Sequence, residues 1–176
     1  MDMSGLLWPL AALLICWVVG AHSRLRRLRN ACWFAVDNLD HALQSLLQVA
    51  KEALDRPDPA TRAHEELTIA ALHLSLTLKT IKSAKLMTGR DDDAQTLGLQ
   101  WAALLLAWQS FCEAHVEVIE VQALDALRTR WEEAHNHGLF AKATVNQAML
   151  AYNAAVQQAP ARWVAARLGF IRVTPL

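Results

Sequence analysis

The residues best suited to chemistry are a glutamate and a histidine in the second half of the chain. Glu132 and His135 stand three residues apart. On a helix, this spacing lets a carboxylate and an imidazole reach one metal ion. A di-iron bundle needs that pair twice, with a glutamate from each of two further helices. Neither His64 nor His115 has a glutamate three residues before it. We therefore expect no cofactor and a solvated helix end here, while metal binding by Glu132 and His135, helped by His137, stays open.

Other patterns typical of active sites do not occur. The chain has no glycine-rich phosphate-binding motif and no GxSxG nucleophile elbow. The stretch from His64 to Thr68 begins like a zinc-protease helix, but Thr68 stands where the second histidine must fall. His73 and His115 lie on or beside apolar stripes, which is typical of packed histidines. The sequence therefore predicts no catalytic residue and a protein that is not an enzyme.

Composition indicates a helical protein. The chain has 176 residues, enough for one domain with its own core, with few glycines and prolines, six and five. Lysine and arginine together number 17, as do aspartate and glutamate. This balance argues against nucleic acid as a partner, since a nucleic-acid binder carries a basic surplus. The three cysteines are widely spread, which favours reduced thiols in a cytosolic compartment over disulfides.

An uncharged run opens the chain. Residues 3–21 carry no charged side chain, and as a helix they would span about 28 Å, close to the hydrocarbon thickness of a bilayer. A cleaved signal peptide is the alternative, because residues 19–21 are small enough for a cleavage site. The first two residues lack the positive charge of a signal peptide, however, and the basic residues follow the run: Arg24, Arg26, Arg27 and Arg29. We therefore expect a transmembrane anchor, residues 1–23, with the C-terminal side in the cytoplasm.

The anchor helix is expected to continue as far as Leu54. An apolar heptad stripe runs along it, formed by Leu25, Cys32, Leu39, Leu46 and Ala53, with Leu28, Ala35, Ala42 and Val49 three residues later. The proline-rich stretch 55–59 ends it. A second helix begins near Pro59 or Thr61. Its stretch 72–78 alternates like a strand, but a lone strand would have no partner, so we predict a helix there.

The rest of the chain predicts three more helices. The third runs from about Ala94 to Asn136, with a break at Gly138. The fourth runs from about Leu139 to Gln158 and ends at Pro160. A short last helix, residues 161–168, is capped by Gly169. Residues 24–176 thus predict an all-α, antiparallel up-and-down bundle of long helices. In this scheme the third helix is about 64 Å long and extends beyond the other helices, which would leave Arg162, Trp163 and Arg167 away from the bilayer. We therefore expect these three residues to pack on the bundle and not to form a second membrane contact.

One tyrosine occurs in the whole chain, and it precedes an asparagine. Tyr152-Asn153 lies seven residues after Val145-Asn146, so a helix places the two asparagines on one face. An asparagine at a half-buried bundle position fixes helix register through hydrogen bonds. We therefore interpret this stretch as the residues that dock the last long helix.

The C-terminal motif resembles that of the LemA family of bacterial membrane proteins. The resemblance rests on the anchor, the basic helix Arg24–Asn30 after it, and a C-terminal set: Lys142, Val145, Asn146, Tyr152, Asn153, Pro160, Gly169 and Phe170. Residues 113–118 look like a further family segment. Val145 stands where the family has its first tyrosine, so the chain would be a diverged member. The resemblance implies an anchored helical bundle in the bacterial inner membrane and no agreed enzymatic activity.

These features together predict a membrane-anchored interaction or scaffold protein that is not an enzyme. Its expected partners are the lipid bilayer, bound through the N-terminal helix, and a protein that the sequence does not identify. A homo-oligomer is left open. The alternatives are a metal-dependent enzyme and, if residues 19–21 are cleaved, a secreted helical domain.

Overall fold

The computed structural model describes residues 3–55, 62–80, 91–115, 121–158, 161–170 and 172–175. Side chains at positions 3–7, 9–11, 91, 121, 161, 164, 166 and 168 lie outside that description. The described residues form helices α1, α2, α4, α5 and α6, and contain no strand.

The longest helix, α1, spans Met3–Leu54 without interruption. The predicted heptad stripe is its buried face: Leu25, Cys32, Ala35, Leu39, Ala42, Leu46, Val49 and Ala53 are each at most 5% exposed. Leu28 is half-buried on the same face. The predicted helix end at Leu54 is thus confirmed, and the proline-rich stretch that follows falls outside the described residues, except for Asp55.

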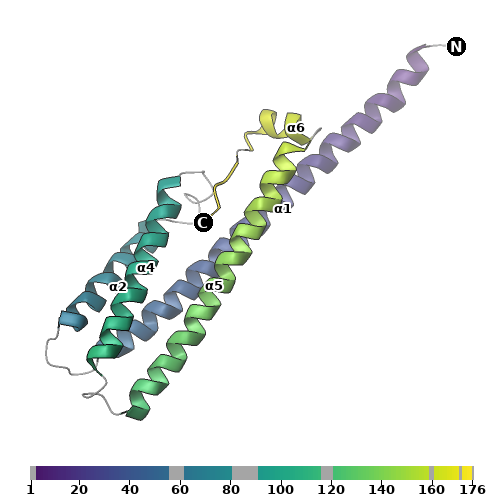
Figure 1. Ribbon diagram of the computed structural model, residues 1–176. Coiled ribbons are helices and arrows are strands. Elements are labelled where there is room, and N and C mark those ends of the chain that lie inside the picture. Colours follow the sequence, from purple (N-terminus) through teal and green to yellow (C-terminus); the bar gives the residue numbers. More distant parts are fainter. Residues whose placement is uncertain are drawn as a thin grey trace.

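The remaining helices run up and down beside α1 (Figure 1). They are α2, Arg62–Thr80; α4, Asp91–Ala114; α5, Val121–Gln157; and α6, Ala161–Leu168. The closest packing joins α1 to α5 and α2 to α4, while α2 also contacts α1. The predicted all-α antiparallel bundle is therefore confirmed for the described residues, and the bounds of α6 match the prediction.

The alternating stretch in α2 is helical, as predicted. Leu74 is fully buried, whereas Leu72 and Leu76 are 55% and 50% exposed. In a half-buried strand the three leucines would share one face, because side chains two apart point the same way. The period of a helix instead turns Leu72 and Leu76 towards solvent.

The prediction of a third helix from Ala94 to Asn136 is wrong. The chain forms α4 up to Ala114 and starts α5 at Val121. Gly138 does not break a helix but lies buried within α5. A Cβ at Gly138 would come within 3.0 Å of the Trp101 ring on α4. The missing side chain of Gly138 therefore allows α4 to pack closely on α5. The role of this glycine is to leave room for Trp101 and not to give the backbone a special conformation.

The changed helix boundaries move the C-terminus. At 1.5 Å per residue, α4 is about 36 Å long and α5 about 56 Å. Helix α5 therefore returns along α1, and α6 packs on both α1 and α5. The Phe170 ring lies 6.0 Å from the ring of His22. The long third helix, on which the expected distance of α6 from the bilayer depended, does not exist. The C-terminal segment instead lies beside His22, next to the N-terminal apolar run.

Aromatic side chains connect α4 to α5. The rings of Trp108 and Trp131 stack with centroids 4.2 Å apart and planes 9° apart, and Trp108 also stacks on Phe111. A second link joins the end of α1 to α5, where both terminal nitrogens of the Arg130 guanidinium donate hydrogen bonds to the carboxylate of Glu52. Trp101, Trp108 and Trp131 are all buried, so these three tryptophans pack the helices together.

No helix within the described residues is both long enough and apolar enough to cross a membrane. The predicted span, residues 3–21, includes eight positions whose side chains are not described. The structure does not support the transmembrane part of the predicted architecture. In the described part of this run, large apolar side chains are exposed, among them Trp8 at 81% and Leu13 at 71%.

Candidate functional site

The tyrosine–asparagine pair on α5 holds the end of the chain in place. Asn153 Nδ2 donates a hydrogen bond to the backbone oxygen of Val173 at 2.6 Å, and Asn153 Oδ1 accepts one from the backbone nitrogen of Val173 at 3.0 Å. The Val173 side chain is buried. Asn153 thus binds the segment after α6 and not a facing helix, so its register role takes a different form from the one expected.

Tyr152 packs inward against α1. It is 3% exposed, and burial raises the pKa of its phenol, while the charge of Arg29 lowers it by a smaller amount. Val145, one heptad earlier, is fully buried. Tyr152 and Val145 thus both pack inward, and their role is to pack α5 into the bundle.

The last helix ends as the sequence predicts. Gly169 has a φ of 71°, and the backbone nitrogen of Phe170 donates to the oxygen of Ala165 at 3.0 Å. This is the hydrogen bond of a Schellman cap, which favours glycine because an L side chain is strained at positive φ. Asn146 is half-buried on α5, and Pro160 lies outside the described residues.

The arginines after the apolar run are all exposed: Arg24, Arg26, Arg27 and Arg29. Arg29 also contacts the C-terminal segment, since its guanidinium carbon lies 6.0 Å from the centroid of the Phe170 ring. Phe170 is half-buried between this guanidinium and His22. The structure therefore brings Gly169 and Phe170 of the C-terminal motif beside the basic segment of α1.

The candidate metal pair does not gather a ligand set. Among the described residues, no group of three or more histidine, cysteine, aspartate or glutamate side chains could hold a metal ion. Glu132 is exposed, and the His135 ring lies edge-on to Trp101 with centroids 6.0 Å apart. His115 is fully buried, with Nδ1 2.7 Å from the backbone oxygen of Phe111. His115 is thus a packed histidine with a backbone partner, as expected, whereas His73, for which the same role was expected, is exposed.

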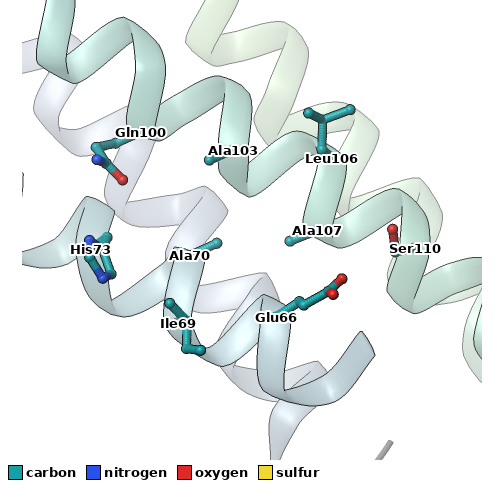
Figure 2. A pocket seen from close by; sticks show the side chains of 9 residues that line it. All are labelled: Glu66, Ile69, Ala70, His73, Gln100, Ala103, Leu106, Ala107 and Ser110. Carbon is teal, nitrogen blue, oxygen red and sulfur yellow. The ribbon is translucent and has the colours of Figure 1, made fainter. Parts of the chain in front are cut away.

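An open groove lies between α2 and α4, and the sequence did not predict it. Its volume is about 420 Å³. Figure 2 shows alanines along its middle, Ala70 from α2 facing Ala103 and Ala107 from α4. Ile69 and Leu106 flank the alanines. Polar side chains lie at the two ends of the groove: His73 with Gln100 at one, and Glu66 with Ser110 at the other.

The groove is bordered by large apolar side chains that the bundle leaves uncovered. Ile69 is 56% exposed and Leu106 67%. Further exposed leucines on the same two helices are Leu72, Leu76 and Leu99. Small residues between two helices leave room for a third element to approach closely, and an exposed apolar border supplies contact area. This surface is therefore suited to binding an apolar or amphipathic segment.

One feature of the sequence, the extra leucines on α2 and α4, pointed to the groove. The exposed leucines fall outside the apolar stripes that form the buried faces of α2 and α4. The bundle core therefore did not account for them. The alternation of Leu72, Leu74 and Leu76 drew attention to their strand-like spacing instead. Ala70, Ala103 and Ala107 gave no signal, since alanine is common on every face of these helices.

Comparison with protein-family models, with curated proteins and with solved structures gave no match at a significant level. The resemblance to the LemA family accordingly rests on the residues quoted above and remains a prediction.

Proposed function

We propose that this protein is a non-enzymatic interaction protein, anchored in a membrane by the N-terminal part of α1, that binds a helix of another protein in the groove between α2 and α4. The groove carries the proposal. It combines a floor of small side chains with an uncovered apolar border at Ile69 and Leu106. Helix-in-groove binding uses this combination, with apolar anchors spaced along one helical face of the ligand.

The ends of the groove suit a helical ligand. His73 and Gln100 at one end, and Glu66 and Ser110 at the other, offer hydrogen-bonding groups about the apolar middle. Glu66 already accepts a hydrogen bond from the Arg62 side chain at 2.8 Å. A pocket with apolar walls and a few polar groups at fixed points gives both affinity and orientation.

Two observations support the membrane anchor. Residues 3–21 are uncharged, and the N-terminal part of α1 extends beyond the other helices (Figure 1). In the described part of this run, Trp8, Leu13, Leu14 and Ile15 are exposed. Exposed arginines follow immediately, which favours a cytoplasmic position for the helical bundle. We place the protein in the bacterial inner membrane and regard it as a diverged member of the LemA family, on the strength of its C-terminal motif.

The groove is tested by a matched pair of substitutions in the full chain. Leu106→Glu puts a charge at the groove border, whereas Leu150→Glu changes a similarly exposed leucine on α5, 59% exposed against 67% for Leu106. Burial of a leucine contributes about 1.5–3 kcal/mol, so Leu106→Glu should weaken partner binding at least about tenfold. Leu150→Glu should leave it unchanged.

The measurement is crosslinking and affinity purification from native membranes, with each captured protein quantified for the wild type and the two variants. A partner lost with Leu106→Glu and kept with Leu150→Glu supports the proposal. Capture of a second copy of this chain, with the same dependence on Leu106, would identify the partner as another copy of this protein and the assembly as a homo-oligomer. Equal capture by all three proteins would refute the groove as the binding site.

A further inference from the structure

Charge is strongly segregated along this chain. Residues 3–36 contain no aspartate or glutamate, and neither do residues 134–176. Exposed arginines occur in both stretches: Arg24, Arg26, Arg27 and Arg29 in the first, and Arg162, Arg167 and Arg172 in the second. The acidic residues lie between these stretches, apart from Asp2.

The fold brings the two acid-free stretches together. Helix α6 packs on α1 and on α5, and Phe170 lies between His22 and Arg29 of α1. The hydrogen bonds between Asn153 and Val173 hold the segment that follows. In Figure 1, α6 lies where α1 leaves the other helices and continues alone towards the N-terminus. The arginines of both stretches thus lie towards one end of the bundle, next to the apolar run, whereas Lys142 of the second stretch lies over the Trp101 ring on α4.

The outer face of α6 is amphipathic in a particular way. Ala165 is buried against the bundle, at 2% exposed, while Trp163 is 68% exposed. Trp163 and Arg167 are four residues apart and share a face that lies opposite Ala165. An exposed indole beside arginines is typical of elements at a membrane surface, where the ring lies at headgroup level and the guanidinium binds phosphate.

The position of α6 along α1 fits such a contact. The apolar run ends at Ala21, and Arg29 is eight residues further on, about 12 Å along the helix. The headgroup region on each side of a bilayer is about 5–8 Å deep. A segment held between His22 and Arg29 therefore lies within or just beyond the headgroups if the apolar run spans the hydrocarbon.

We propose that α6 is a second membrane contact, in which Trp163, Arg162 and Arg167 bind the anionic surface of the bilayer that holds the N-terminal part of α1. This inference rests on the proposed membrane anchor. Its consequence is that the bundle does not swivel freely on α1: two contacts fix its orientation relative to the membrane, and with it the direction in which the α2–α4 groove faces.

The test uses the full chain reconstituted into vesicles whose lipids carry bromine at shallow acyl positions, which quench nearby indoles. Vesicles of phosphatidylcholine with phosphatidylglycerol are compared with vesicles of phosphatidylcholine alone. The signal of Trp163 is the difference between the wild type and Trp163→Phe. The signal of the anchor is the difference between the wild type and a Trp8→Phe, Trp17→Phe double variant.

We expect the Trp163 signal to be quenched in the anionic vesicles and much less in the neutral ones. Each arginine near an anionic surface contributes a factor of about five, so Arg162→Ser with Arg167→Ser should shift the equilibrium of contact about 25-fold towards release. Arg62→Ser, an exposed arginine at the start of α2, is the matched control and should leave Trp163 quenching unchanged.

The two proposals fail in different ways. Quenching of the anchor tryptophans without quenching of Trp163 would overturn the second contact and leave the anchor in place. Absence of quenching at both would overturn the anchor and the second contact together. Equal quenching of Trp163 in both kinds of vesicle would refute the role of the arginines. All three side chains on α6 are exposed, so circular dichroism of the variants should match the wild type.

Discussion

Replacement of Asn153 by leucine should release the end of the chain and leave the helical bundle folded. The side-chain amide of Asn153 makes two hydrogen bonds to the backbone of Val173, one as donor and one as acceptor. Leucine has the same number of side-chain heavy atoms and the same branch point but can make neither. A net contribution of about 0.5–1.5 kcal/mol for each hydrogen bond gives a loss of about 1–3 kcal/mol.

That loss should appear as local opening. Among the described residues after α6, only Val173 has a buried side chain, whereas the other buried residues lie on the helices or, for His115, directly after α4. A cost of about 1–3 kcal/mol corresponds to an increase of about five- to 150-fold in the population of the open state. The free energy of global unfolding can fall by no more than the docking free energy of this segment, since the bundle remains after the segment is released.

Hydrogen exchange at the Val173 amide measures the opening directly, because that N–H is the donor to Asn153. Exchange should accelerate by the stated factor in Asn153→Leu, while amides in the middle of α5 keep their protection. Gln147→Leu, at an exposed position on the same helix, is the control and should change neither.

Asn153→Asp separates the two hydrogen bonds. A carboxylate can still accept from the Val173 nitrogen, but it cannot donate to the Val173 oxygen, which lies 2.6 Å from the present amide nitrogen. Exchange should therefore be fast above the pKa of the new carboxyl group and slower below it, where a protonated acid can donate. Unchanged protection of Val173 in Asn153→Leu would refute the role of Asn153 in docking the chain end.

Two further predictions follow from the core. Gly98→Ala should stabilise the fold by about 0.5–1 kcal/mol, since nothing lies within 4 Å of the new Cβ, whereas Gly138→Ala should gain less or destabilise, because its Cβ would meet the Trp101 ring at 3.0 Å. Denaturant unfolding of both variants measures the difference, and an equal gain would contradict the packing role of Gly138. Burial raises the pKa of Tyr152 above 10.0, so the free energy of unfolding should be unaffected by this group below pH 10 and fall as pH rises through the folded pKa. Absorbance titration of this single tyrosine checks it, with Tyr152→Phe as reference, and a phenol titrating at or below its ordinary pKa would contradict the burial argument.

The heptad stripe of α1 was predictable because a regular apolar period is a strong signal. Leu25, Cys32 and Leu39 recur every seven residues, and nothing within Arg24–Leu54 breaks a helix. The break between α4 and α5 was harder to see, because residues 116–120 contain neither glycine nor proline. One feature of the sequence did indicate a break. The apolar residues up to Val118 fall on one helical face, and those from Ile119 onward fall on another.

Gly138 misled the prediction for a related reason. A glycine in a helical pattern suggests a helix end when only neighbouring residues are considered. Its actual cause lies on another helix, where the Trp101 ring occupies the space of a side chain. Contacts of this kind depend on which helices pack together. The predicted third helix ended just before residue 138, so the sequence analysis placed this residue at the end of a helix and not within α5.

The functional surfaces were the least predictable part. The link between Asn153 and Val173 spans 20 residues and requires α6 and the segment after it to turn back along α1. The groove requires α2 and α4 to lie side by side with their surplus leucines outward. Sequence periodicity could show that Leu72 and Leu106 fall off the buried stripes, but not that the fold would gather them on one surface.

The packing of the helices divides the molecule into parts that serve the two proposals separately. Helices α1 and α5 form the long pair, with α6 at one end; α2 and α4 form a shorter pair beside it, joined to the long pair through α1–α2 packing and the Trp108–Trp131 stack. The arginines of the proposed membrane contact belong to α1 and α6, and the groove belongs to the short pair. Helices α1 and α5 pack along each other as one unit. A membrane contact at the end of this unit would therefore set the position of the groove without altering the shape of the groove. Orientation, and not a conformational change, is therefore the means by which α6 would influence binding at the groove.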